Sequence, residues 1–141
     1  MTTLAANKAR AYEAQEEPSI NDLPVVATDI IYEGAAVGDN GSGISRPLVA
    51  GDVFQGFADR KCDNSAGAAS AKNVRVRQRG AVVLAVTGVS SAADEHETVY
   101  ATDDDTFTLT ASGGSSIGKV KRWITSTSCV VYFEGASLRS I

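Results

Sequence analysis

The sequence predicts an all-β fold, a small antiparallel β-barrel or sandwich with an extended N-terminal arm. After residue 24, short apolar and β-branched runs recur roughly every 8–12 residues, with Gly, Asn, Asp and Ser between them. No long amphipathic helical pattern interrupts this series. The 141 residues predict one domain, or one domain with a tail. A chain of this length buries roughly 70% of its unfolded surface, so it needs no disulfide or metal to be stable.

Residues 1–24 differ from the rest, and we expect them to form an arm on a β-barrel-like domain of residues 25–141. An Ala-rich stretch at 4–17 favours helix, but an isolated helix of that length is marginal in water. Pro18 would end such a helix, and Pro24 favours an extended chain before it. We therefore expect an extended or weakly helical arm that becomes ordered only against a partner surface, or else a disordered terminus.

The first half of the body contains the stretch around which the other elements are organised. Strands are expected at 25–27, 29–32, 34–38, 44–49 and 53–60. Asn40-Gly41 favours a hairpin turn, and Pro47 places its strand at a sheet edge. In the strand 53–60, Phe54 and Phe57 are predicted on opposite faces, one in the core and the other against a neighbour, a subunit or the arm. Gly56 between them indicates a bulge or the close approach of another backbone or ring.

The second half continues the alternation. Strands are expected at 72–78, 82–86, 99–101, 106–110, 117–124 and 129–133, the last two as a hairpin. Val74 and Val76 are expected to point inward. Residues 90–98 are expected to form a loop or one helical turn, and Asp103–Asp105 and 113–116 are expected to form turns.

Arg75, Arg77 and Arg79 form a candidate basic stripe on the outer side of the strand 72–78. Such a stripe can meet phosphate or an acidic protein patch. No aromatic residue lies among the three arginines for base stacking, and the net charge of the chain is −4. We therefore favour ion pairs with Asp and Glu, within the chain or across an interface, and expect no nucleic-acid partner.

The sequence indicates no catalytic or cofactor chemistry. His96 stands beside acidic residues in a loop without a second His or a Cys pair, so a solvated loop is favoured over a metal site. Asp103–Asp105 lack the spacing of an EF-hand, so a turn is favoured over calcium binding. Nucleophile-elbow, P-loop and dinucleotide motifs are absent. We expect no enzyme, no cofactor and no metal. Cys62 and Cys129 are interpreted as two free thiols, although the sequence leaves open whether they approach each other.

Neither a charged-then-apolar leader nor an apolar run long enough to cross a bilayer is present, so we expect neither secretion by a cleaved signal nor a membrane partner.

The order of these motifs resembles that of the small phage head proteins known as capsid cement or decoration proteins, a group sometimes labelled recombinase. The resemblance covers most of the chain after the arm and is carried by 32–37, 47–58, 63–67, 74–76, Gly80, 99–101, 103–109 and 117–120. Residues 90–98 depart from the family pattern, in which a shorter Gly-containing turn precedes Val-Tyr. No phosphate-binding Gly-rich loop with Lys-Ser or Lys-Thr is present, so we set the recombinase function aside.

The resemblance implies a structural virion protein on the capsid exterior, assembled in the host cytoplasm. Its implied partners are the major capsid protein and further copies of itself, as a dimer or trimer. It would cement neighbouring capsid subunits and so stabilise the head, because many weak footholds combine into strong binding. On this reading, deletion of residues 1–24 is expected to leave a folded domain that binds the capsid more weakly.

The alternatives are a head-fibre module that binds a receptor or glycan, and a nucleic-acid accessory protein that acts through the arginine stripe. The candidate capsid or subunit contacts are Leu4, Arg10, Tyr12, Ile20, Leu23, Arg75, Arg77 and Arg79.

Overall fold

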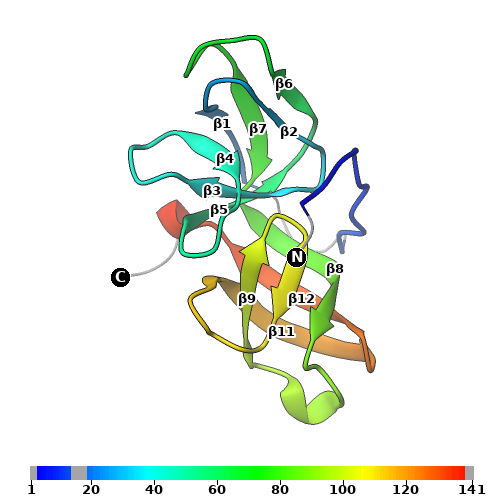
Figure 1. Cartoon of the computed structure of the whole chain (residues 1–141). Coiled ribbons are helices and arrows are strands. Elements are labelled where there is room, and N and C mark those ends of the chain that lie inside the picture. The colour runs from blue at the N-terminus through cyan, green and yellow to red at the C-terminus, as the bar shows by residue number, and fades with distance from the viewer. Residues whose placement is uncertain (1–2, 14–18, 139–141) are drawn as a thin grey trace.

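A closed β-barrel and an open sheet lie one against the other in the computed structural model, which describes residues 3–13 and 19–138 (Figure 1). Nearly all regular structure in these residues is β-strand, which confirms the predicted all-β class. Two short 3₁₀ turns, η1 (Ala92–Asp94) and η2 (Ala136–Leu138), are the described exceptions. The first of them lies in the stretch 90–98, as expected.

The barrel contains five strands in the order β10-β8-β12-β11-β9. Their bounds are β8 Arg79–Thr87, β9 Thr98–Asp103, β10 Thr106–Thr108, β11 Ser115–Thr125 and β12 Ser128–Glu134. The β9–β10 and β11–β12 hairpins match the sequence prediction. The barrel is closed by a parallel pairing of β10 with β8, where Phe107 lies opposite Val86. The other strand pairs of the barrel are antiparallel, as the predicted fold class requires.

The open sheet has the order β1-β7-β5-β3-β4. Its strands are β1 Ile20–Pro24, β3 Ala36–Asp39, β4 Ser45–Pro47, β5 Val53–Ala58 and β7 Asn73–Arg77. A separate two-stranded sheet joins β2 (Asp29–Ile31) to β6 (Cys62–Asn64). The predicted edge position of Pro47 is confirmed, because β4 pairs within the sheet with β3 alone.

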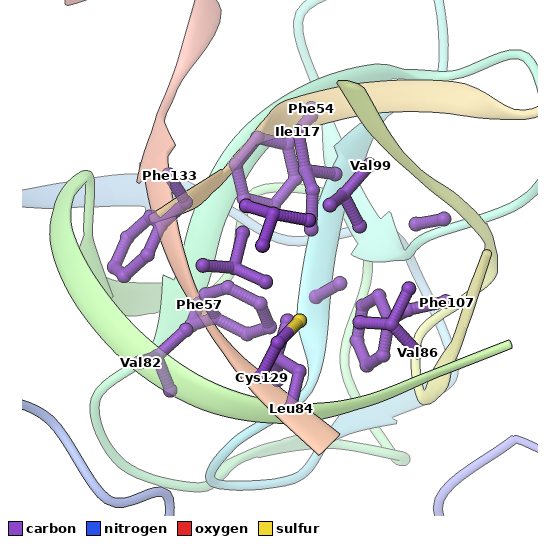
Figure 2. Close-up of a cluster of buried hydrophobic side chains, with 14 of the residues drawn as sticks. Phe54, Phe57, Val82, Leu84, Val86, Val99, Phe107, Ile117, Cys129 and Phe133 are labelled. Carbon is purple, nitrogen blue, oxygen red and sulfur yellow. The ribbon is translucent and has the colours of Figure 1, made fainter. Parts of the chain in front are cut away.

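Two buried clusters form the interior. The barrel core fills the barrel and includes Val82, Leu84 and Val86 from β8, whose alternating positions are buried as predicted (Figure 2). The sheet core lies under the open sheet and includes Val74 and Val76, both fully buried. Burial of apolar side chains in each cluster supplies the main driving force for folding, roughly 25 cal/mol per Å².

Strand β5 connects the two halves, and its aromatic residues correct the sequence prediction. Phe54 and Phe57 both lie in the barrel core, with ring centroids 5.6 Å apart, and do not occupy opposite faces (Figure 2). The register shifts where Val37 and Gly38 face Gly56 and Phe54, so Gln55 is an extra residue. This bulge moves the alternation by one residue and places both rings on one side.

Gly56 has the special role that its position between the two aromatics indicated. Its φ angle is +134°, and a Cβ atom there would meet the carbonyl oxygen of Arg77 on the neighbouring strand. Only glycine fits both conditions without strain. The predicted close approach of another backbone is confirmed.

Of the segment 1–24 expected to form an arm, residues 20–24 form the edge strand β1, which pairs with β7 over its whole length. Residues 3–13 follow an irregular path without helix (dark blue in Figure 1). Part of the Ala-rich stretch and Pro18 lie outside the described residues. The boundary at residue 24 stays a prediction, but the sheet of the body includes β1.

Candidate functional site

The N-terminal segment, residues 3–13, crosses both halves of its own chain. Leu4 packs against the sheet core, and Tyr12 packs against the barrel core. The backbone N–H of Lys8 donates to Glu33 O at 2.8 Å. The expectation that this segment becomes fixed only against a partner is therefore wrong for its described part.

Tyr12 places the segment in the ladder of the barrel. It forms an antiparallel bridge with Val82 of β8. On either side, Val83 N–H donates to Ala11 O and Glu13 N–H donates to Ala81 O, both at 2.9 Å. The segment therefore covers part of an edge that β8 would otherwise expose, which is one way to prevent unwanted strand pairing.

Arg10 is the most buried charged group of the segment. Its Nε donates to Gly34 O at 2.8 Å, and its Nη2 donates to Asp105 Oδ1 at 3.0 Å. Only 5% of its side chain is exposed, and its guanidinium carbon lies 5.5 Å from the ring centroids of Phe57 and of Phe107. Charge-assisted hydrogen bonds and aromatic faces together offset the cost of burying the cation.

The tip of the β9–β10 hairpin receives the segment. Asp103 shapes the turn, because its carboxylate accepts from Asp105 N–H at 2.8 Å and from Thr106 Oγ1 at 3.0 Å. Asp105 pairs with both Lys8 and Arg10 at 3.0 Å. Asp104 accepts the N–H of Leu4 at 3.0 Å and is 1% exposed. The predicted turn is confirmed, and its carboxylates also hold the N-terminal segment.

The electrostatics of Asp104 follow from its position. Burial raises its pKa to about 6, and the neighbouring carboxylates of Asp103 and Asp105 add to this effect. The N–H of Leu4 and the charge of Arg10 act in the opposite direction. Asp104 is therefore an ionised but poorly solvated carboxylate at neutral pH.

Gly34 allows the segment to approach closely. Its φ angle is +87°, and a Cβ atom there would meet the carbonyl oxygen of Lys8. The same glycine supplies the carbonyl that Arg10 binds. A side chain at this position would displace the segment from the body.

At the far end of the segment, Glu13 reaches β11. Its carboxylate lies 2.7 Å from Arg122 Nη2 and 3.6 Å from Lys121 Nζ. These ion pairs are partly exposed and contribute little individually. Their position matters more, because they connect the segment to a third barrel strand.

Two arginines of the predicted stripe, Arg75 and Arg77, form ion pairs within the described part of the chain. Arg75 Nε lies 3.7 Å from Asp22 Oδ1, and Arg77 Nη2 lies 3.4 Å from Asp59 Oδ1. The Arg77 guanidinium also stacks 4.0 Å over the ring of Tyr12. The register places Arg79 opposite Glu134. The favoured interpretation of ion pairs within the chain is confirmed for Arg75 and Arg77.

The other predicted contact residues are divided between interior and surface. Leu23 packs against the sheet core, whereas Ile20 is 45% exposed on the edge strand β1. Of the eight candidates, Leu4, Arg10 and Tyr12 meet in one docking arrangement with the body. Sequence reasoning missed the residues that receive them, chiefly Gly34, Asp104 and Asp105. The sequence does show acidic residues that could pair with Lys8 and Arg10, but it does not indicate which acidic residue pairs with which cation.

The structure also places His96, Cys62 and Cys129, the other residues considered for chemical roles. His96 is exposed, and its backbone N–H donates to Val120 O at 2.8 Å. Cys62 and Cys129 are free and buried in separate clusters, and burial raises the pKa of Cys129 to about 11. Among residues 3–13 and 19–138, no three His, Cys, Asp or Glu are placed to hold a metal ion. No helix in the same residues is long and apolar enough to cross a membrane.

Aromatic side chains that could form a glycan platform are half-buried. Tyr32, Tyr100, Trp123 and Tyr132 all fall in this class, and three of them lie within strands.

Comparison with known proteins adds no assignment. No family model matches the chain, and a search of curated proteins finds no match.

Proposed function

We propose that this chain is a structural virion protein that binds the outer surface of a phage capsid and cements neighbouring major capsid protein subunits. The observation that carries the proposal is that the residues on which the resemblance to capsid cement proteins rests have structural roles. The turn at Gly34, the bulge at Gly56 and the tip at Asp103–Asp105 fix backbone geometry and hold the N-terminal segment. Each of these motifs serves as scaffold.

The physical requirements of a cement protein are consistent with this arrangement. Such a protein must resist force without deforming, and two cores joined through β5 make separation of the halves costly. The N-terminal segment strengthens the join, since it contacts both cores. Repeated copies around a shell would add their footholds, and a dimer or trimer would add more.

The decisive experiment is electron microscopy of heads from the phage that encodes the chain, with and without its gene. We expect density of this fold on the outside of wild-type heads at the junctions of capsid subunits. Heads without the gene should lose this density and release DNA at a lower temperature. Absence of the protein from purified particles would overturn the proposal.

A second experiment concerns the N-terminal segment. Protein lacking residues 1–18 retains β1 and can be added to heads that lack the gene. Occupancy below that of the full chain would support a role for the segment in capsid binding. Equal occupancy would assign the segment to folding alone, and the footholds would then lie on the body.

A further inference from the structure

A groove of about 500 Å³ lies between the start of the N-terminal segment, β2 and β4. Its walls include the apolar side chains of Leu4, Ile30 and Pro47. Val49 also lines it and is 49% exposed. The groove therefore offers apolar area to a second molecule.

The charge of the groove is negative. Asp104 lines it, with a carboxylate that is ionised at neutral pH and poorly solvated. The cations of the N-terminal segment, Lys8 and Arg10, pair with the neighbouring Asp105. Asp29 lines the groove as well and adds a second carboxylate.

Arg46 also lines the groove but contributes little net charge. Its guanidinium is held by Asp52 in a bidentate pair, with Nη2 to Oδ1 at 2.8 Å and Nε to Oδ2 at 3.0 Å. A neutralised pair of this kind does not repel a second cation strongly. Among the residues that line the groove, Asp104 and Asp29 therefore supply the net charge.

Tyr32 lines the same groove, and Lys61 of the same chain already lies over its ring. Lys61 Nζ lies 5.5 Å from the centroid of this ring. The carboxylates and the aliphatic walls of the groove together match a long basic side chain, whose stem is apolar and whose end is charged.

We propose that this groove binds a Lys or Arg side chain from an extended segment of a partner protein, with the charged end beside Asp104 and the aliphatic stem against Leu4 and Pro47. Charge complementarity selects this occupant over an acidic or purely apolar segment. The proposal does not depend on the partner being a capsid subunit, and it can fail while the proposed function holds.

The test is an NMR titration of the ¹⁵N-labelled full chain with the peptide acetyl-Gly-Lys-Gly-amide. We expect shifts of the Leu4 and Ile30 amides that saturate at millimolar peptide and weaken in 0.5 M NaCl. The same peptide with norleucine in place of lysine keeps the stem without the charge. It should bind at least about fivefold more weakly, since a charge-assisted contact is lost.

Two variants locate the site. Asp104→Asn keeps an oxygen acceptor for the Leu4 N–H and should weaken lysine-peptide binding about fivefold. Asp22→Asn changes an exposed carboxylate on β1, outside the groove, and should leave binding unaltered. If Asp104→Asn fails to fold, Asp29→Asn replaces it, with a smaller loss expected. Equal binding of the norleucine peptide, no shift at Leu4 and Ile30, or an unaltered affinity in the groove variant would each overturn the proposal.

Discussion

Arg10 and Asp105 lie 95 residues apart in the sequence, and the structure joins them by an ion pair of 3.0 Å, in which only 5% of the arginine side chain is exposed. This pair brings together the first described residues of the chain and the tip of a barrel hairpin. The same segment makes two further contacts nearby: Arg10 Nε donates to Gly34 O, and the backbone N–H of Leu4 donates to Asp104. The N-terminal segment is therefore part of the folded body.

Replacement of Arg10 by alanine should destabilise the protein by about 3 kcal/mol, since it removes a buried cation and its hydrogen bonds to Gly34 O and Asp105 Oδ1. Lys8→Ala is the matched control. Lys8 pairs with the same carboxylate, but its side chain is 49% exposed, so we expect a loss of about 0.5 kcal/mol. Urea unfolding measures both values. Equal losses would mean that burial of Arg10 does not strengthen its contacts.

The pH dependence of stability should reveal Asp104. Its pKa is about 6 in the folded state, against 3.8 for the ordinary group. The folded state then binds more protons than the unfolded state between these values. The contribution of Asp104 to stability is therefore greatest below pH 3.8 and is lost as the pH rises through 6, by about 3 kcal/mol at most.

Asp104→Asn should remove this pH dependence, because the amide does not titrate. Relative to the wild type, the variant should gain stability between pH 4 and pH 7, as judged by urea unfolding at each pH. A constant difference between the two proteins across this range would show that Asp104 titrates normally. A ¹³C titration of the Asp104 carboxyl in the wild type measures its pKa directly.

The bulge in β5 should be intolerant of any side chain. Gly56→Ala combines φ of +134° with a clash against the carbonyl oxygen of Arg77, so we expect a loss of more than about 3 kcal/mol. Gly41→Ala is the control, because Gly41 has φ of +98° but nothing within 4 Å of an added Cβ. It should lose about 1 kcal/mol from backbone strain alone. Similar losses would exclude the clash as the main cause.

Local patterns explain why the sequence predicted the strands and turns. The inward positions of Val74 and Val76 follow from the two-residue period of a strand, and the turn at Asn40-Gly41 follows from local backbone preferences. Both features depend only on neighbouring residues, and both are found as predicted. The placement of Phe54 and Phe57 failed because the bulge depends on the pairing of β5 with β3, and the carbonyl of Arg77 on β7, the other neighbour of β5, requires glycine at position 56. The parallel seam between β8 and β10 is likewise a property of barrel closure.

The sequence indicated the contact residues of the N-terminal segment but not the residues that receive them, because the pairing depends on contacts between distant parts of the chain. Arg10 and Tyr12 stood out as contact residues, and Asp103–Asp105 stood out as an acidic turn. Charge alone did not pair them, because the chain has 17 acidic residues that could receive a cation. Gly34 lies between β2 and β3, and its role in admitting the backbone of Lys8 became visible only in the structure.

The two cysteines should be unreactive in the folded protein. Burial raises the pKa of both thiols, that of Cys129 to about 11, and a thiol in this state reacts slowly. With Ellman's reagent at pH 8 we expect no fast phase, and slow labelling at the rate of unfolding. Cys62, which is 7% exposed against 0% for Cys129, should react first. Fast labelling of both would contradict the burial of these side chains.

Two truncations should separate the contributions of the N-terminal residues. Removal of residues 1–18 deletes the contacts of Arg10 and Tyr12 but keeps β1, so the protein should fold with a lower melting temperature.

Removal of residues 1–24 also deletes β1, which exposes the edge of β7 and takes Leu23 from the sheet core. An unpaired strand edge over an open core promotes aggregation, so the longer truncation should form soluble aggregates on size-exclusion chromatography. Circular dichroism should then show that only the shorter one melts cooperatively. A monomeric, cooperatively folding protein without residues 1–24 would support the predicted division at residue 24 and would show that β1 is dispensable for folding.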